Sequence, residues 1–226
     1  MSIQALPPLV ASVFSLLAIA ALLLTFVMLG SRWLNHYLYA FAAESWLIAG
    51  LSVTVGIYAH YSELLLIALL TILFRGLLLP YLIARIIRRQ AVSYEMHVIL
   101  QPSSSLVAGA ACVVFALVIA YHVGSQLDLV GTVAVIALTV MLAMKLIGFL
   151  MLSIRHEAIS QVLGLLILEN GIFLGAQVLV PGMPMLLEIV ILFDLLVAVA
   201  CFGVLVRYLS SAAGTTSSLD LNRLVG

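Results

Sequence analysis

The sequence contains few charged residues for its length. Of its 226 residues, nine are Lys or Arg and nine are Asp or Glu, so that 8% are charged and the formal net charge is zero. A soluble domain carries about 25% charged residues, and so few charges do not cover a water-facing surface. This excludes a soluble globule, a disordered chain and a nucleic-acid-binding protein with a basic face. Apolar residues make up 65% of the chain, which indicates an integral membrane protein whose surface is mostly in contact with lipid.

The sequence also lacks the motifs of catalysis and cofactor binding. It has no GxGxxG loop, Walker motif, CxxC pair or nucleophile elbow, so we expect no catalytic site, redox centre or cofactor in this chain. Its two cysteines, Cys112 and Cys201, lie in apolar runs, which favours a packing role over a disulfide or a metal site. The segment from Met1 to Pro8 has no basic residue, so the first apolar run is expected to be a permanent span and not a signal peptide.

The apolar runs predict an all-α integral membrane protein with about seven transmembrane helices. A spanning helix needs about 20 mostly apolar residues. The chain contains seven such runs, at residues 7–29, 34–58, 63–87, 105–124, 129–152, 159–180 and 185–208. Helices are favoured over a β-barrel because the runs are continuous and do not alternate in short segments.

The basic residues outside these runs predict the orientation. They gather in alternate connections and after the last span, at Arg32, Arg85, Arg88, Arg89, Arg155, Arg207 and Arg223. The positive-inside rule then places the N-terminus outside and the C-terminus in the cytoplasm, in agreement with an odd number of spans. Aromatic residues near the span ends predict an interfacial belt, made of Trp33, Tyr37, Tyr39, Tyr58 and Tyr61.

Six charged residues lie inside the expected spans. They are Glu44, Arg75, Lys145, Glu169, Glu188 and Asp194. Each costs roughly 2.5–3.5 kcal/mol at a helix centre, so such groups usually face the bundle interior and mark a function. Four of them, Glu44, Arg75, Glu169 and Asp194, lie near the middle of their spans and are expected in one layer. Lys145 is expected somewhat towards the cytoplasm, and Glu188 towards the outside.

Two interpretations of these charges remain open. Buried carboxylic acids bind protons more readily than exposed ones, and a nearby cation opposes this, so the set suits proton movement. In this interpretation the acids form the path, and Arg75 and Lys145 modulate their pKa values. In the other, Arg75 neutralises Glu44 or Glu169 in a static pair that holds helices together.

Small residues and a proline add two structural expectations. Gly164, Gly171 and Gly175 lie seven and four residues apart, which predicts a face for close helix packing. Pro80 lies five residues after Arg75 and is expected to kink or break its helix beside that buried charge.

Three stretches carry a resemblance to a known family. They are RHEAISQVLGLLILENGIFL at residues 155–174, EIVILFDLLVAVACFGVLVR at 188–207 and LDLNRL at 219–224. Together they resemble the hydrogenase-4 component E family, membrane subunits of complex I-like [NiFe] hydrogenases that include formate hydrogenlyases. The segment FRGLLLP at residues 74–80 is compatible with that family. The resemblance covers residues 153–226 well and is diffuse before them.

The last three spans are also similar to the K subunit of bacterial complex I and to the C subunit of cation/proton antiporters. In the K subunit, two helices each carry a buried glutamate in the proton path. Asp194 stands in the place of the second one. With Asn170 aligned to the family asparagine, Leu166 takes the place of the first, and Glu169 lies nearly on the same face about one turn deeper. The resemblance implies a four-helix region at residues 1–128, a K-like module at 129–209 and a cytoplasmic tail at 210–226.

The leading hypothesis is a proton-path subunit in the membrane arm of a hydrogenase-like complex of a bacterial or archaeal cytoplasmic membrane. Its expected partners are antiporter-like and anchor subunits and, through them, a [NiFe] hydrogenase-type peripheral arm. Glu169 and Asp194 would carry protons, with Glu44 on the same path and Glu188 giving access from outside. The alternative is a purely structural subunit that bridges the anchor and an antiporter-like subunit. A stand-alone antiporter is less compatible with the weak internal symmetry, and a retinal pump with a last span that lacks lysine.

Overall fold

The chain folds into a bundle of helices. The computed structural model describes residues 8–58, 62–89, 101–126, 132–155 and 158–179, together with isolated positions between 186 and 200. No β-strand occurs in these described ranges. The helices are α1 (Pro8–Gly30), α2 (Leu34–Tyr58), α3 (Ser62–Leu70), the π-helix η2 (Thr71–Leu78), α4 (Leu79–Arg89), α5 (Pro102–Gln126), α6 (Thr132–Ile154) and α7 (Ala158–Leu179).

Five of these helical segments are long and apolar enough to cross a membrane. They are Pro8–Gly30, Leu34–Tyr58, Ser62–Arg85, Pro102–Gln126 and Val133–Ile154, and they coincide with the first five expected spans. The sixth expected span coincides with α7, whose apolar stretch Gln161–Gln177 is shorter. The seventh, at residues 185–208, and the tail at 210–226 lie outside the described residues apart from isolated positions. The chain is therefore a helical, multi-pass membrane protein.

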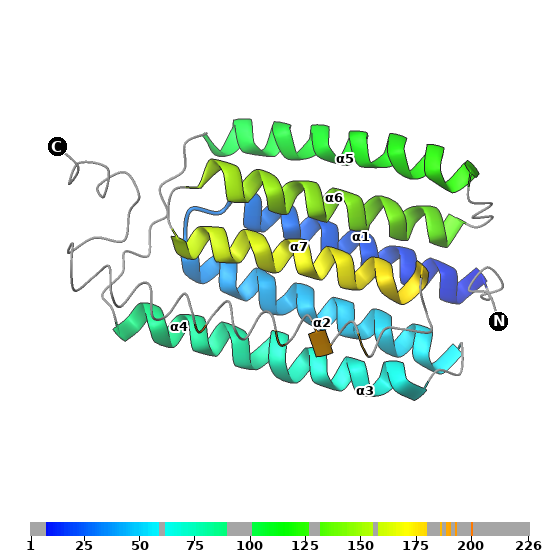
Figure 1. Cartoon of the computed structure of the whole chain (residues 1–226), viewed down its shortest axis with the longest axis horizontal. Helices are drawn as coiled ribbons and strands as arrows, with labels where there is room; N and C mark the ends of the chain where they lie inside the picture. The colour runs from blue at the N-terminus through cyan, green and yellow to red at the C-terminus, as the bar shows by residue number, and fades with distance from the viewer. Residues whose placement is uncertain are drawn as a thin grey trace.

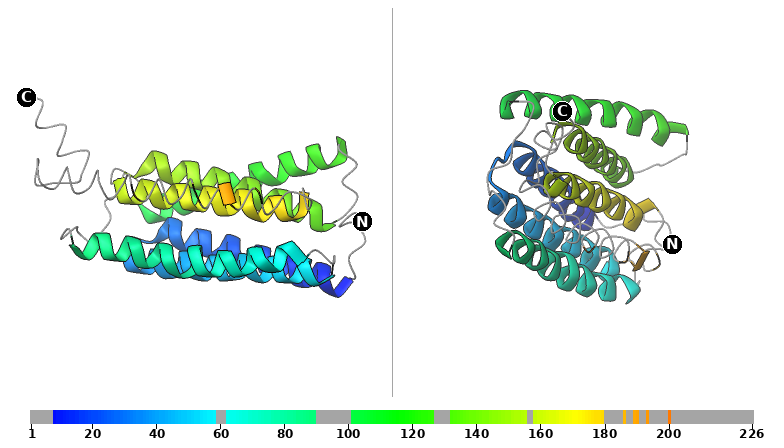
Figure 2. Two further views of the ribbon diagram at one scale, coloured as in Figure 1. Left: turned by 60° about the horizontal axis from the view of Figure 1, so that its bottom comes forward. Right: turned by 60° about the vertical axis from the view of Figure 1, so that its left-hand side comes forward.

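The helices form two layers that pack face to face. One layer contains α1, α2 and the rod formed by α3, η2 and α4, and the other contains α5, α6 and α7 (Figures 1 and 2). The layers meet where α1 packs on α5 and α6 and where α2 packs on α7. Helix α5 belongs to the expected region at residues 1–128, so that region packs on the one at 129–209 where α5 and α1 contact α6 and where α2 contacts α7.

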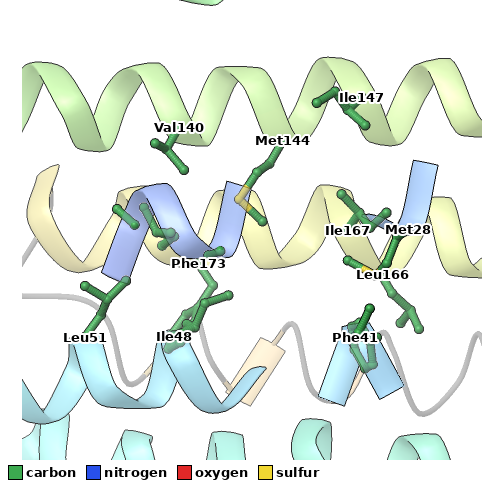
Figure 3. Close-up of a cluster of buried hydrophobic side chains, with 14 of the residues drawn as sticks. Met28, Phe41, Ile48, Leu51, Val140, Met144, Ile147, Leu166, Ile167 and Phe173 are labelled. Carbon is green, nitrogen blue, oxygen red and sulfur yellow. The ribbon is translucent and has the colours of Figure 1, made fainter. Parts of the chain in front are cut away.

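Apolar side chains fill the space between the layers. Figure 3 shows part of this core, to which Met28 of α1, Phe41 and Ile48 of α2, and Leu166 and Phe173 of α7 contribute. The opposite faces of the helices are equally apolar but exposed, as for Leu23 on α1 and Val118 on α5. A helix that is apolar on all sides is typical of a membrane span, in which one side meets protein and the other meets lipid.

Glycines bring α6 and α7 into backbone contact. A β-carbon at Gly164 would lie 3.1 Å from the carbonyl oxygen of Gly148, and one at Gly171 would lie 2.8 Å from Cβ of Met144. Gly175 of α7 faces Met141 of α6. The close-packing face expected from these three glycines of α7 is confirmed, and its partner is α6.

Substitution of Gly148 tests this contact. We expect Gly148→Ala to lower stability by about 1–3 kcal/mol, because the new methyl group would lie 2.8 Å from the Gly164 carbonyl oxygen and would push the helices apart. The measurement is the thermal unfolding midpoint in detergent. Gly50→Ala is the control, since its methyl group would lie 3.7 Å from Leu17, an ordinary contact. Equal midpoints for the two variants would contradict the prediction.

The expected kink at Pro80 takes the form of a π-helix. The rod from Ser62 to Arg89 is uninterrupted, but Thr71–Leu78 widens to π geometry, and the Leu79 N–H donates to the carbonyl of Phe74. Proline lacks an N–H and its ring clashes with the carbonyl four residues earlier, so widening of the preceding turns relieves the conflict. Gly76 in this segment lies against Trp46 of α2, where a β-carbon would be 2.9 Å from the indole nitrogen.

Two residues expected near the membrane surface are buried. Tyr37, expected in the aromatic belt, is buried in α2 and its hydroxyl donates to the carbonyl of Leu163 at 2.7 Å. Arg155, expected on the cytoplasmic rim, is buried, and its Nη2 donates to the carbonyls of Met28, Leu29 and Ser31. The last carbonyls of a helix have no partner within it and favour a cation, so Arg155 caps the end of α1.

Candidate functional site

A buried carboxylate lies where three helices meet. Glu44 of α2 is fully buried, and each of its two oxygens accepts a hydrogen bond from another helix. Oε1 accepts from Oγ1 of Thr25 on α1 at 2.6 Å, and Oε2 accepts from Nδ2 of Asn170 on α7 at 2.8 Å. These bonds supply polar partners to a group that is otherwise costly to place in an apolar interior.

The amide of Asn170 connects this carboxylate to a buried cation. Its Oδ1 accepts a hydrogen bond from Nη1 of Arg75 at 2.8 Å, while its Nδ2 donates to Glu44. The orientation of the amide follows from its neighbours, because a guanidinium only donates and an ionised carboxylate only accepts. Asn170 is itself almost fully buried, so both of its bonds are shielded from solvent.

Arg75 belongs to the π-helix η2 and is fully buried. Its guanidinium carbon lies 5.2 Å from the ring centroid of Phe173 on α7, a distance at which an aromatic face attracts a cation. Within the described residues, the hydrogen-bonded connection from Arg75 to Glu44 runs through Asn170. The site therefore joins α1, α2, η2 and α7, and it crosses the expected boundary between the four-helix region and the K-like module.

The structure brings together two of the six predicted site residues and places a third at the same level of the bundle. Glu44 and Arg75 are each hydrogen-bonded to Asn170, and Glu169, which is 9% exposed, precedes Asn170 in the chain. Glu44, Arg75 and Glu169 thus lie at one level of the bundle, as expected from their positions in the spans. Glu188 and Asp194 lie outside the described residues.

Lys145 of α6 lies close to this level of the bundle. Its backbone nitrogen is 3.4 Å from the place of a β-carbon on Gly171, the residue that follows Asn170 in α7. The Lys145 side chain is half-buried, and no hydrogen bond joins it to Glu44, Asn170 or Arg75.

Sequence reasoning based on charge missed Thr25 as a partner of Glu44 and Asn170 as the link to Arg75. The signal was present, since both are neutral polar residues in the middle of apolar spans. Two further neutral polar residues join α2 and α7, where Nε2 of Gln177 donates to Oγ of Ser52 at 2.8 Å. The polar residues that face inwards are thus more numerous than the charges alone indicate.

Helical spans with a buried polar site at their centre define the class of this protein, an all-α multi-pass membrane protein. It is 30% identical over 178 residues to "Uncharacterized protein Rv0085" of Mycobacterium tuberculosis (strain ATCC 25618 / H37Rv), which is 78% of this chain and 78% of that protein. The chain belongs to the family of that mycobacterial protein. No protein-family model and no solved structure matches the chain.

Proposed function

We propose that the chain is a membrane-arm subunit of a complex I-like membrane-bound hydrogenase of the formate hydrogenlyase type. It would contribute buried carboxylates to a proton or cation path coupled to electron transfer on other subunits. In this proposal it lies in a bacterial or archaeal cytoplasmic membrane, with seven spans, the N-terminus outside and the C-terminus in the cytoplasm. The resemblance of residues 153–226 to the hydrogenase-4 component E family supports the choice of complex.

The observation that supports an ion path in this chain is the hydrogen-bonded site around Glu44. A proton carrier must be hydrogen-bonded with and without its proton. The hydroxyl of Thr25 donates to Glu44, and a hydroxyl also accepts, so it remains a partner when the carboxyl is protonated. Asn170 keeps Arg75 close to Glu44 through a neutral amide, which provides a nearby positive charge without a direct ion pair between these two described residues.

The remaining residues have the roles proposed from the sequence. Glu169 and Asp194 carry protons, Glu188 gives access from the outside, and Arg75 and Lys145 modulate the proton affinity of the acids. Glu169 precedes Asn170, so a path along α7 passes the Glu44 site. The partners in the membrane are antiporter-like and anchor subunits, which connect this chain to a [NiFe] hydrogenase-type peripheral arm.

A purely structural role is the second candidate, and one observation favours it. Both oxygens of Glu44 are already hydrogen-bonded, and apolar side chains such as Phe41, Ile48 and Phe173 pack around the site. In that case the chain bridges the hydrogenase anchor and an antiporter-like subunit, and the polar contacts hold α1, α2, η2 and α7 together.

The test uses the complex purified in mild detergent through a tag on this chain and reconstituted in vesicles. We expect hydrogenase subunits to copurify. We expect Glu44→Gln to lower hydrogen-dependent proton movement by at least about tenfold, because a positioned acid is lost from a proton-transfer step. Proton movement is followed with a pH-sensitive dye, and hydrogenase activity with a soluble electron acceptor reports whether the complex is intact.

Glu63→Gln is the matched control. It makes the same change at an exposed position in the first turn of α3, and proton movement is expected to stay at the wild-type rate. Normal proton movement in Glu44→Gln, or loss of the whole complex, would favour the structural role. Purification of this chain with no hydrogenase subunit would contradict the choice of complex.

A further inference from the structure

The seam between α2 and α7 contains a buried side-chain amide whose NH₂ group is hydrogen-bonded and whose oxygen is not. Gln177 is fully buried, and its Nε2 donates to Oγ of Ser52, which is also fully buried. Its Oε1 is buried and has no hydrogen-bond partner among the described residues. A buried carbonyl acceptor without a partner is unfavourable and rare in native proteins, and ordered water is a common partner for such a group.

The hydrogen bonds of Ser52 determine which end of the Gln177 amide lacks a hydrogen-bond partner. The Ser52 hydroxyl has one proton, which it donates to the carbonyl of Ile48 at 3.2 Å. It must therefore accept from Gln177, and only the NH₂ end of that amide donates. The oxygen end is thus the one without a protein partner.

The Ser52–Gln177 contact is one of three that follow the same seam at nearly equal spacing. Tyr37 bonds to Leu163, Glu44 to Asn170 and Ser52 to Gln177, so that each step is seven or eight residues along both helices. Because the numbers rise together, α2 and α7 are parallel. At a rise of about 1.5 Å per residue, successive contacts lie roughly 10–12 Å apart along the bundle. The polar contacts thus recur through much of the membrane thickness.

We propose that Gln177 Oε1 and Ser52 form a water-binding site that continues the proton path from Glu44 towards the end of α2 at Tyr58. This inference rests on the proposed function, because it assigns the outer half of that path. The ligand is water, which accepts and passes on a proton. The excess proton leaves Glu44 and forms an O–H bond with one water, and each water gives up another proton to the next, so the amide stays neutral and unchanged.

Apolar side chains separate the two levels and keep this connection closed at rest. Ile48 lies between Glu44 and Ser52 on α2, and Phe173 lies between Asn170 and Gln177 on α7. Both are fully buried members of the cluster in Figure 3. Water joins the levels only when these side chains move apart, which gives the path a gate at that height.

Two substitutions and a matched control test the site in the reconstituted complex. We expect Gln177→Leu and Ser52→Ala to lower proton movement by about tenfold, the effect of one lost hydrogen bond to a charged species. Ser45→Ala is the control, because Ser45 is equally buried on α2 but donates only to the carbonyl of Phe41 on its own helix. We expect Ser45→Ala to match the wild type.

An electron cryomicroscopy map of the complex, at a resolution that shows ordered water, gives a readout that does not depend on activity. We expect density for a water within hydrogen-bond distance of Gln177 Oε1. A protein donor in that place would overturn the proposal. The map of the wild-type complex gives this test even if the Gln177→Leu variant does not assemble. Loss of proton movement in Glu44→Gln but not in Gln177→Leu would overturn this inference alone. Normal proton movement in both variants would contradict the proposed function, and with it the proton-carrying role of this water.

Discussion

Arg75→Met is expected to destabilise the protein by about 3–5 kcal/mol, because it removes one member of a buried set of opposite charges. Without Arg75, the carboxylate of Glu44 remains in the interior with only neutral hydrogen-bond donors, and Oδ1 of Asn170 loses its partner. The variant is expected to accumulate in the membrane well below the wild-type level and to unfold at a lower temperature in detergent.

A double substitution tests whether Glu44 is the reason for this loss. We expect Arg75→Met combined with Glu44→Gln to recover about 1–3 kcal/mol, since the second change removes the charge that the first leaves uncompensated. Arg85→Met is the control, because Arg85 is exposed on the same helical rod and should tolerate the change. Strictly additive effects of the two substitutions would show that Arg75 and Glu44 are not coupled through Asn170.

Asn170→Leu is expected to have an effect of similar size, about 3 kcal/mol or more, because it breaks two hydrogen bonds to charged groups at once. Leucine is close to asparagine in size, so the helix contacts of α7 are largely kept while Oε2 of Glu44 and Nη1 of Arg75 lose their shared partner. The measurement is again the unfolding midpoint in detergent.

The control for this substitution is on the same helix. Gln161→Leu replaces an exposed side chain whose amide donates to the carbonyl of Arg155 at 3.3 Å, a weak contact near the membrane surface. We expect it to change stability by no more than about 0.5 kcal/mol. If Asn170→Leu is as stable as Gln161→Leu, then the amide of Asn170 does not hold the site together.

The spans were predictable because the bilayer fixes their length. About 20 apolar residues are needed to cross it, and hydropathy summed over such a window locates a helix without knowledge of its neighbours. The five helices that are long and apolar enough to cross a membrane agree with the expected spans within a few residues. The glycine face of α7 was predictable for a similar reason, because small residues at spacings of four and seven have few other roles in an apolar helix.

The site was predictable only in part. Glu44, Arg75 and Glu169 stood out because a charge inside a span is costly, and their depth followed from counting residues. Thr25 and Asn170 did not stand out, because a hydroxyl or an amide in a span costs less and has several possible partners. The position of Arg155 directly after its span was predictable, but its burial was not, because the carbonyls that accept from it lie at the end of α1, far away in the sequence.

The sequence by itself determined that this chain is a helical membrane protein, where five helices long enough to span the membrane lie, and that Glu44, Arg75 and Glu169 are buried in its helices. The tertiary structure decided which neutral side chains join those charges, that Pro80 widens the helix and does not break it, and that α2 and α7 meet in register. The reason is that spans apolar on all sides do not reveal which face turns inward. That face is set by packing between helices far apart in the chain, as between Glu44 and Asn170.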